Sequence, residues 1–125
     1  MSSYRELRVW NEAMDFAVSV YAATAKFPKH EFFAGLAGQL RRAAISIPSN
    51  IAEGKGHRTH RECLNFLAHA RGSLCEAETQ IELACRLSYI SNEQAVALQA
   101  SATRIAKGVA GLMNFMRSTG PEKAT

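Results

Sequence analysis

The sequence predicts an all-α protein, an antiparallel up-down four-helix bundle formed by a single domain. Apolar side chains recur at alternating steps of three and four residues in four successive segments, which keeps them on one side of a helix. The 125 residues contain only three prolines and no convincing strand alternation. Chains of about 100–150 residues are typical of one domain, and short connections make consecutive helices antiparallel.

The expected helices span residues 4–26, 31–54, 59–88 and 91–118, and residues 119–125 are expected to form a flexible tail. The apolar positions of the first two segments are Val9, Ala13, Phe16, Val20, Ala23 and Phe27, then Phe33, Leu36, Leu40, Ala43 and Ile47. Those of the last two are Cys63, Leu67, Ala70, Leu74, Ala77, Ile81 and Ala84, then Ala95, Leu98, Ala102, Ile105, Val109, Leu112 and Met116. Each set forms an apolar stripe along one side of its helix, and the four stripes together predict one shared core.

Local signals support these helix ends. The S/T-x-x-E/Q capping box, whose side chains satisfy N–H groups at a helix start, occurs at Ser3–Glu6, Thr59–Glu62 and Ser91–Gln94. Pro28 ends the first segment because a proline disfavours helical geometry in the residue before it. Pro48 lies inside the second segment, where we expect it to kink the helix.

Composition and charge narrow the setting in which the protein works. The net charge of +4 modestly favours acidic partners. No apolar run approaches the roughly 20 residues of a membrane-spanning helix, and the opening MSSYRELRVW is no secretory signal. Cys63, Cys75 and Cys85 lack C-x-x-C spacing and are expected to be reduced core thiols. The sequence thus predicts a cytoplasmic protein without a membrane segment.

The second segment carries apolar surface on two sides. Gly38, Ile45 and Ala52 follow one another at seven-residue spacing and lie almost opposite the Leu36–Ile47 stripe, at about 100° per residue. Either a second copy packs on this face, or the helix is central and covered on both sides by its own chain. We favour self-association through this face.

No catalytic or metal-binding pattern stands out in the sequence. It contains no G-x-S-x-G nucleophile motif, no phosphate-binding loop and no Glu-x-x-His pair. His57, His60 and Cys63 have a ligand-like spacing, but the basic residues between them would repel a cation. We therefore expect no enzyme activity, no cofactor and no metal.

Five polar residues are expected to form a structural cluster inside or beside the bundle, where polar groups set register and partner choice. They are Arg42, Asn50, Glu53, Arg71 and Glu78. Arg71 and Glu78 are seven residues apart near the edge of the third stripe, which favours a structural ion pair. An acid–base site is the alternative.

The connection between the second and third segments is basic. Residues 55–61, KGHRTHR, contain no acid, and Arg41 and Arg42 on the preceding helix are expected to lie beside them. Basic clusters attract nucleic acid through counterion release, although a solvated loop is an equal alternative. Most of the ten aromatic residues fall on apolar stripes, so no stacking platform for single strands is visible. The candidate nucleic-acid contacts are Arg41, Arg42, Lys55, His57, Arg58, His60 and Arg61.

Residues 39–56, QLRRAAISIPSNIAEGKG, resemble the signature of the four-helix-bundle family of proteins encoded in 23S rRNA intervening sequences. Residues 7–21 and 66–84 extend the resemblance, which runs from about Leu7 to Arg117. The matching signature positions are Arg41, Arg42, Ser46, Ile47, Asn50, Ile51, Ala52, Glu53, Gly54, Ser73, Leu74 and Glu76.

The resemblance implies an up-down bundle that assembles into rings, typically pentamers. A related bundle, the accessory protein of diversity-generating retroelements, forms a basic pentameric barrel implicated in engaging nucleic acid. The leading hypothesis is therefore a non-enzymatic, ring-forming bundle that binds RNA or another polyanion through basic loop surfaces. The rival hypothesis is a protein–protein scaffold with no nucleic-acid role.

Overall fold

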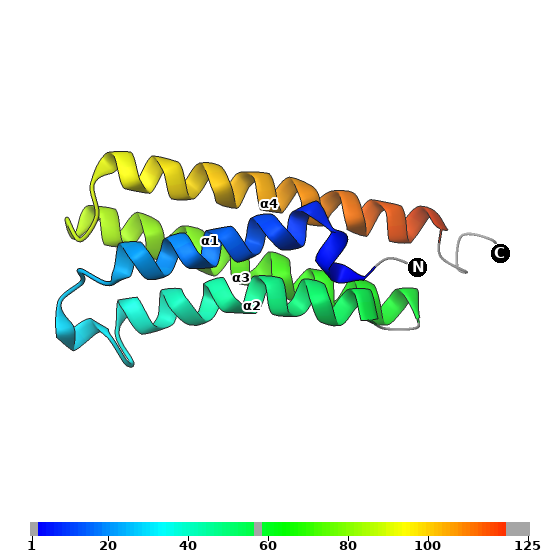
Figure 1. The fold of residues 1–125 in the computed structure, drawn as a ribbon, viewed down its shortest axis with the longest axis horizontal. Coiled ribbons are helices and arrows are strands. Elements are labelled where there is room, and N and C mark those ends of the chain that lie inside the picture. Colours follow the sequence, from blue (N-terminus) through cyan, green and yellow to red (C-terminus); the bar gives the residue numbers. More distant parts are fainter. Residues whose placement is uncertain (1–2, 57–58, 120–125) are drawn as a thin grey trace.

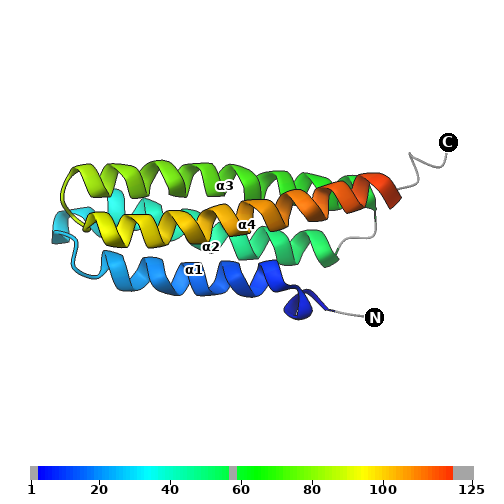
Figure 2. The same ribbon diagram turned by 90° about the horizontal axis from the view of Figure 1, so that it is seen from above.

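The computed structural model describes residues 3–56 and 59–119, and within these ranges it contains helices and no strand. The long helices lie side by side, and α1 and α4 close the bundle against each other (Figures 1 and 2). The predicted antiparallel four-helix bundle is confirmed. Its elements are η1 (Tyr4–Glu6), α1 (Arg8–Thr24), η2 (Lys29–Glu31), α2 (Leu36–Gly56), α3 (His60–Arg86) and α4 (Asn92–Thr119), where η denotes a short 3-10 helix.

The apolar stripes form the core of this bundle. All seven predicted positions of the third stripe are buried, and so are most positions of the other three. Phe33 is an exception, 87% exposed because it precedes α2, and Met113 is buried where Leu112 was expected. A 3.6-residue helical period drifts from a strict heptad, which explains the shift at the end of α4. No helix in the described ranges is long and apolar enough to cross a membrane.

The predicted capping box forms with both of its bonds at the start of α4, and at the start of α3 the Thr59 side chain caps the helix. The Ser91 N–H donates to Gln94 Oε1 at 3.0 Å, and the Gln94 N–H donates to Ser91 Oγ at 3.1 Å. At α3 the Glu62 N–H donates to Thr59 Oγ1 at 3.1 Å. Because these side chains satisfy donors that a helix start leaves free, both helices begin within one residue of the predicted position.

The first helix begins at Arg8, so the predicted start at residue 4 was wrong. Ser3 accepts a hydrogen bond from the Arg5 N–H and thereby caps only η1. Leu7 then adopts an extended conformation, which separates η1 from α1. The capping signal was real, but it marks a single 3-10 turn.

The second helix begins at Leu36, so its predicted start at residue 31 was also wrong. The Leu36 N–H donates to Glu31 Oε1 at 2.7 Å, which satisfies one donor of the helix start. The chain folds back so tightly before α2 that a Cβ on Gly38 would overlap the carbonyl oxygen of Phe33. This turn keeps residues 32–35 out of the helix.

Pro48 is accommodated inside α2, which continues on both sides of it to Gly56. The side chain is buried and lines the contact between α1 and α2. The expected kink at this residue stays a prediction.

Glu31 also ties together two connections at one end of the bundle. The Tyr89 hydroxyl, in the connection between α3 and α4, donates to Glu31 Oε2 at 2.8 Å. The Leu36 N–H, followed by this hydroxyl, holds the pKa of Glu31 below its usual range, and the same contact raises the pKa of Tyr89. The folded protein therefore favours the ionised form of Glu31 more than the unfolded chain does.

This arrangement predicts a loss of stability in acid. A lowered pKa in the folded state stabilises the protein above the unfolded pKa, and that stabilisation disappears as pH falls through the folded pKa. We expect Glu31→Gln to be less stable than wild type at neutral pH, with the difference shrinking in acid. Urea unfolding across the acid range measures this, with exposed Asp15→Asn as control. A gap that is constant with pH would contradict the role of the carboxylate.

Candidate functional site

The candidate nucleic-acid contacts separate into two groups on α2. A helix rises about 1.5 Å per residue, so Arg41 and Arg42 lie about 20 Å along the axis from Lys55. Because α2 runs from Leu36 to Gly56, the two arginines are in its first third, nearer the end that follows η2, and Lys55 is at the opposite end. The expectation that the arginines lie beside the basic connection was therefore wrong.

Arg41 already has partners within the chain. Its Nε donates to Thr24 Oγ1 at 2.7 Å, and its guanidinium lies over the rings of Tyr21 and Phe32, at 4.7 and 5.4 Å from their centroids. These contacts join α2 to α1 and to the turn before α2. The structure thus gives half-buried Arg41 a packing role.

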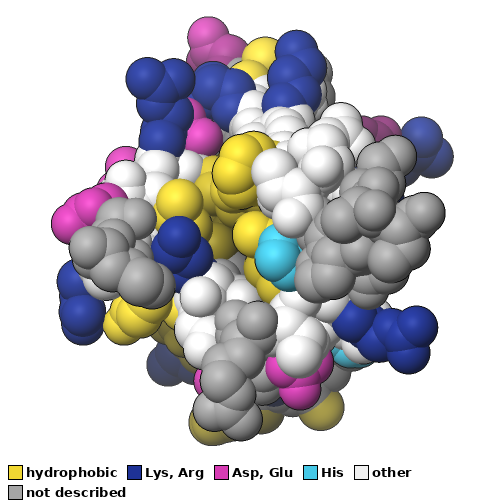
Figure 3. All heavy atoms as spheres, turned by 90° about the vertical axis from the view of Figure 1, so that its right-hand side faces the viewer, with side chains coloured by type: hydrophobic (Ala, Val, Ile, Leu, Met, Phe, Trp, Pro, Cys, Tyr) yellow, Lys and Arg dark blue, Asp and Glu magenta, His cyan; other side chains and the backbone are white. Residues whose placement is uncertain are grey.

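The basic end of the bundle retains three of the candidate contacts. Lys55 and Arg61 are exposed, and His60 at the start of α3 is half-buried. Figure 3 looks at this end and shows Lys and Arg side chains at several places around it, with acidic side chains between some of them. His57 and Arg58 lie outside the described residues. We call Lys55, His60 and Arg61 the basic end.

The three thiols are unpaired, but they are not all in the core. Cys63 is buried beneath the basic end, and this burial raises its pKa, opposed by the charge of Lys55. Cys85 is half-buried and Cys75 is exposed. The prediction of core thiols was therefore correct for Cys63 and wrong for Cys75.

The five residues of the expected polar cluster face different parts of the bundle. Arg71 and Glu78 make their contacts with α4, through the guanidinium and a backbone carbonyl. Asn50 lies on the side of α2 that faces α3. Arg42 is exposed on the same side of α2 as Asn50, whereas Glu53 is exposed on α2 and lines neither depression between α2 and α3. The structure therefore does not assemble these five residues into one site.

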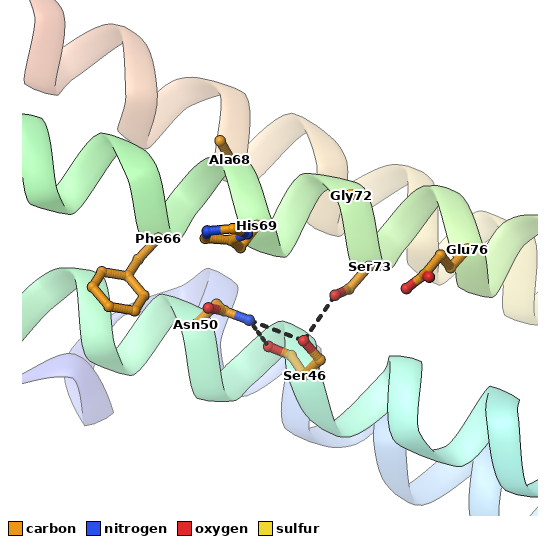
Figure 4. Close-up of a pocket in the computed structure, with 8 residues that line it drawn as sticks. All are labelled: Ser46, Asn50, Phe66, Ala68, His69, Gly72, Ser73 and Glu76. Carbon is orange, nitrogen blue, oxygen red and sulfur yellow. Dashed lines mark hydrogen bonds between the residues drawn. The ribbon is translucent and has the colours of Figure 1, made fainter.

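A polar groove of about 600 Å³ runs between α2 and α3 (Figure 4). A depression of about 220 Å³ continues it along the same helices. We call the two together the α2–α3 groove. The residues that line it are Gln39, Arg42, Ala43, Ser46, Asn50, Phe66, Ala68, His69, Gly72, Ser73, Glu76 and Gln80.

Ser46 is the centre of the hydrogen bonds in this groove (Figure 4). Its Oγ accepts from Asn50 Nδ2 at 2.9 Å and from Ser73 Oγ at 2.8 Å. Asn50 Nδ2 also donates to the Ser46 carbonyl at 2.8 Å. Both of these bonds use the amide nitrogen of Asn50, and its Oδ1 accepts no hydrogen bond from the residues that the structure describes.

The rest of the groove combines a carboxylate with two rings. Glu76 is exposed and makes no ion pair with any described residue. Phe66 and His69 lie edge to face, with centroids 6.4 Å apart. Arg42 lines the continuation of the groove, where its Nη1 donates to the Phe33 carbonyl at 3.3 Å.

The sequence carried a signal for this groove that was missed. Its α3 side contains Ala68 and Gly72, and it also contains Phe66, His69, Ser73, Glu76 and Gln80, which recur at steps of three and four residues. This is the spacing that identified the apolar stripes, but it is carried by mostly polar residues. Five signature residues of the family resemblance also line the groove, and these are Arg42, Ser46, Asn50, Ser73 and Glu76.

An apolar surface lies on the α1 side of α2. The side chains of Ile45 and Met14 are 44% and 41% exposed, and Val18 and Tyr21 continue the exposed apolar surface on α1. We call these four residues, with the groove beside them, the α1–α2 face. The groove has a volume of about 330 Å³ and is lined by Tyr4, Trp10, Met14, Ala17, Ile45, Pro48, Ser49 and Ala52.

This face includes two of the three predicted contact residues. Ile45 and Ala52 line its groove, and the chain itself covers Ile45 only in part. Gly38 is instead buried against the backbone of Phe33. The prediction that Gly38 belongs to an exposed contact surface was therefore wrong.

Two observations concern the side chains that catalysis or metal binding would use. His69 and Ser73 both line the α2–α3 groove, but the Ser73 hydroxyl donates to Ser46 and not to the imidazole. No group of three or more His, Cys, Asp or Glu in residues 3–56 and 59–119 is arranged to hold a metal ion.

Comparisons with known proteins agree with the signature residues. The model of the 23S rRNA-intervening sequence protein family matches residues 5–111. A similar crystal structure is that of a protein of unknown function from the S23 ribosomal protein family of Bacteroides thetaiotaomicron VPI-5482. It has a TM-score of 0.76 and 26% identity, covering 85% of this chain and 95% of that chain. A search of curated proteins gave no match. The chain therefore belongs to the family of 23S rRNA-intervening sequence proteins.

Proposed function

We propose that this protein is a non-enzymatic bundle that assembles into a ring and binds RNA or another polyanion through its basic end. The observation that carries the proposal is the exposure of Lys55 and Arg61 at the same end of the bundle. Lysine and arginine side chains displace condensed counterions from nucleic acid. This release drives protein binding to RNA or DNA whatever the nucleotide sequence. The net charge of +4 adds long-range attraction.

The α1–α2 face supports self-association. Four large apolar side chains on two adjacent helices are 41–67% exposed, and contiguous apolar surface of this kind is typical of interaction sites. The family resemblance implies a ring of typically five copies. A cyclic axis parallel to the helices would bring the same end of every copy to one side of the ring.

Assembly would strengthen polyanion binding. Each copy contributes one basic end, and later contacts become intramolecular once the first has formed. Modest attraction at a single end therefore becomes useful affinity without any surface that recognises individual bases. The two parts of the proposal, ring and polyanion, reinforce each other in this way.

The second candidate function is a protein scaffold with no nucleic-acid role. The same α1–α2 face favours it, because an apolar surface also packs against an unrelated protein. The two functions differ in salt dependence. Phosphate contacts weaken steeply with added salt, whereas an apolar protein interface does not.

The polyanion proposal predicts the behaviour of a double variant, Lys55→Gln with Arg61→Gln. We expect weaker RNA binding whatever the sequence, and a salt slope reduced by about one for each phosphate group that the variant no longer binds. Fluorescence anisotropy with labelled RNA at two salt concentrations measures both quantities. Arg104→Gln with Lys107→Gln is the matched control, because it removes the same charge from exposed positions on α4.

Two outcomes would contradict this proposal. The first is an absence of binding by wild-type protein at low salt, which would leave the scaffold function standing. The second is equally weakened binding in both double variants, which would mean that net charge and not the basic end attracts RNA.

A further inference from the structure

The short N-terminal turn η1 forms one wall of the groove on the α1–α2 face. It packs against both α1 and α2 (Figure 1), and Tyr4 at its start lines the groove together with Trp10. The Tyr4 and Trp10 rings lie edge to face, with their centroids 5.1 Å apart. The Arg5 guanidinium lies 5.1 Å from the centroid of the Tyr4 ring. The turn thus adds an aromatic pair to an apolar surface.

Asn11 on α1 holds this turn in place. Its Nδ2 donates to the Arg5 carbonyl at 2.9 Å and to the Leu7 carbonyl at 3.0 Å. No residue of η1 is fully buried, and Leu7 between η1 and α1 is extended. A turn of three residues that buries so little apolar surface gains little from the hydrophobic effect. Its position therefore depends on the hydrogen bonds of Asn11 and on the contact between Tyr4 and Trp10.

The α1–α2 face needs more than its four exposed side chains to make a stable interface. These side chains are 41–67% exposed, and they belong to Met14, Val18, Tyr21 and Ile45. Each leaves on the order of 100 Å² of accessible surface. A stable interface buries about 800 Å² on each partner, so the four supply about half of the area. The groove walled by η1 adjoins them and can supply more.

We propose that the contact between copies extends from the α1–α2 face over the N-terminal turn. Tyr4 and Trp10 form its aromatic centre, and Asn11 is the residue that positions them. This inference rests on the proposed assembly into a ring. Tyrosine and tryptophan often carry most of the binding energy at protein interfaces, because they bury a large area at a small cost in side-chain entropy. A pair that Asn11 already holds loses little further freedom when a second copy covers it.

The chemistry of the groove favours a second copy as its occupant. The residues that line it, all within the described part of the chain, are uncharged. A phosphate or a charged peptide would lose its water there without gaining a partner. A ring contact joins two different surfaces of the same chain, and α4 exposes apolar side chains of its own at Val96 and Phe115. A second copy can therefore bring apolar surface to the groove.

Trp10 is the only tryptophan of the chain, so intrinsic fluorescence reports on this groove alone. The comparison is between wild type and Val18→Glu. Val18 is 67% exposed on the α1–α2 face and does not line the groove, so its replacement should give a single chain with the surroundings of Trp10 unchanged. We expect wild-type Trp10 to emit at shorter wavelength and to be quenched less by acrylamide, because a second copy excludes water from the half-buried ring.

Asn11→Ala tests the positioning role. We expect it to raise the midpoint concentration of assembly about tenfold, the scale of a lost hydrogen bond. Trp10 should also be quenched more readily in this variant than in wild type. Asn114→Ala, which removes the same side chain from an exposed position on α4, should assemble like wild type. Light scattering over a dilution series gives the masses, and circular dichroism should show the same helix content in every variant.

Each contrary result has a different meaning. If wild type is assembled but its Trp10 is quenched as readily as that of monomeric Val18→Glu, the contact does not include the N-terminal turn, although the ring stands. If Asn11→Ala and Asn114→Ala assemble alike, Asn11 does not position the contact. An assembled Val18→Glu variant would place the contact on another surface. A wild type that is monomeric at every concentration would contradict the ring itself, and this contact with it.

Discussion

Replacing Gly38 by alanine is expected to destabilise the folded protein by about 3 kcal/mol, the upper range for an overpacked position. The added Cβ would overlap the carbonyl oxygen of Phe33, with the Phe32 carbonyl oxygen 2.8 Å from it. These are backbone atoms, so the clash cannot be relieved by a change of rotamer. The turn that starts α2 would have to open, which would disturb the Leu36–Glu31 hydrogen bond. Urea unfolding followed by circular dichroism measures the effect.

Gly111→Ala is the matched control for this prediction. Gly111 is exposed inside α4, and a Cβ there would meet nothing within 4 Å. Alanine is favoured over glycine in a helix by about 1 kcal/mol, so this variant should be more stable than wild type. The two substitutions are chemically identical and have opposite expected signs. If Gly38→Ala unfolds at the same urea concentration as wild type, the tight turn is not required for the fold.

The helices could be predicted because their information is local and periodic. The third stripe, from Cys63 to Ala84, repeats its 3-4 spacing over the whole of α3, and every position in it is buried. Capping signals at Thr59 and Ser91 also predicted where α3 and α4 begin, because each signal acts within a single helical turn. Such patterns need no knowledge of the rest of the chain.

The start of α2 could not be predicted because distant contacts decide it. Phe33 and Leu36 continue the apolar spacing, which favoured a helix from residue 31. The turn is instead held by Glu31, whose carboxylate meets both the Leu36 N–H and the hydroxyl of Tyr89, 58 residues further on. A contact over that separation has no trace in the local pattern.

The candidate sites were found only in part, for two different physical reasons. Arg41 was expected to contact a polyanion, but it donates a hydrogen bond to Thr24 on α1. These two residues are 17 positions apart in the sequence, so the local pattern gave no sign of the contact. The α2–α3 groove was missed because only apolar residues were followed along each helix. His69, Ser73 and Glu76 have helical spacing of their own, so a search for polar stripes would have found this side of α3.

The largest expected effect on assembly comes from Ile45→Glu. Ile45 is 44% exposed in the single chain and lines the groove of the α1–α2 face beside Trp10 and Met14. The exposed position tolerates a charge in an isolated bundle, because the glutamate can reach water. In a subunit contact the same charge would be buried without a partner, which costs several kcal/mol. We therefore expect the variant to fold as a bundle but to remain a single chain.

Leu83→Glu separates this effect from a general one. Leu83 is 46% exposed on α3, almost the same as Ile45, and it lies outside the α1–α2 face. Light scattering coupled to size exclusion should give an assembled mass for wild type and for Leu83→Glu, and the mass of one chain for Ile45→Glu. Circular dichroism should show unchanged helix content in all three. A monomeric wild type at micromolar concentration would rule out the ring, and an assembled Ile45→Glu variant would move the contact to another surface.

If the ring forms through this face, Ile45→Glu should also weaken RNA binding. The monomeric variant keeps an intact basic end, but a single chain cannot hold one RNA through several basic ends at once. We therefore expect the monomer to bind RNA more weakly than wild type.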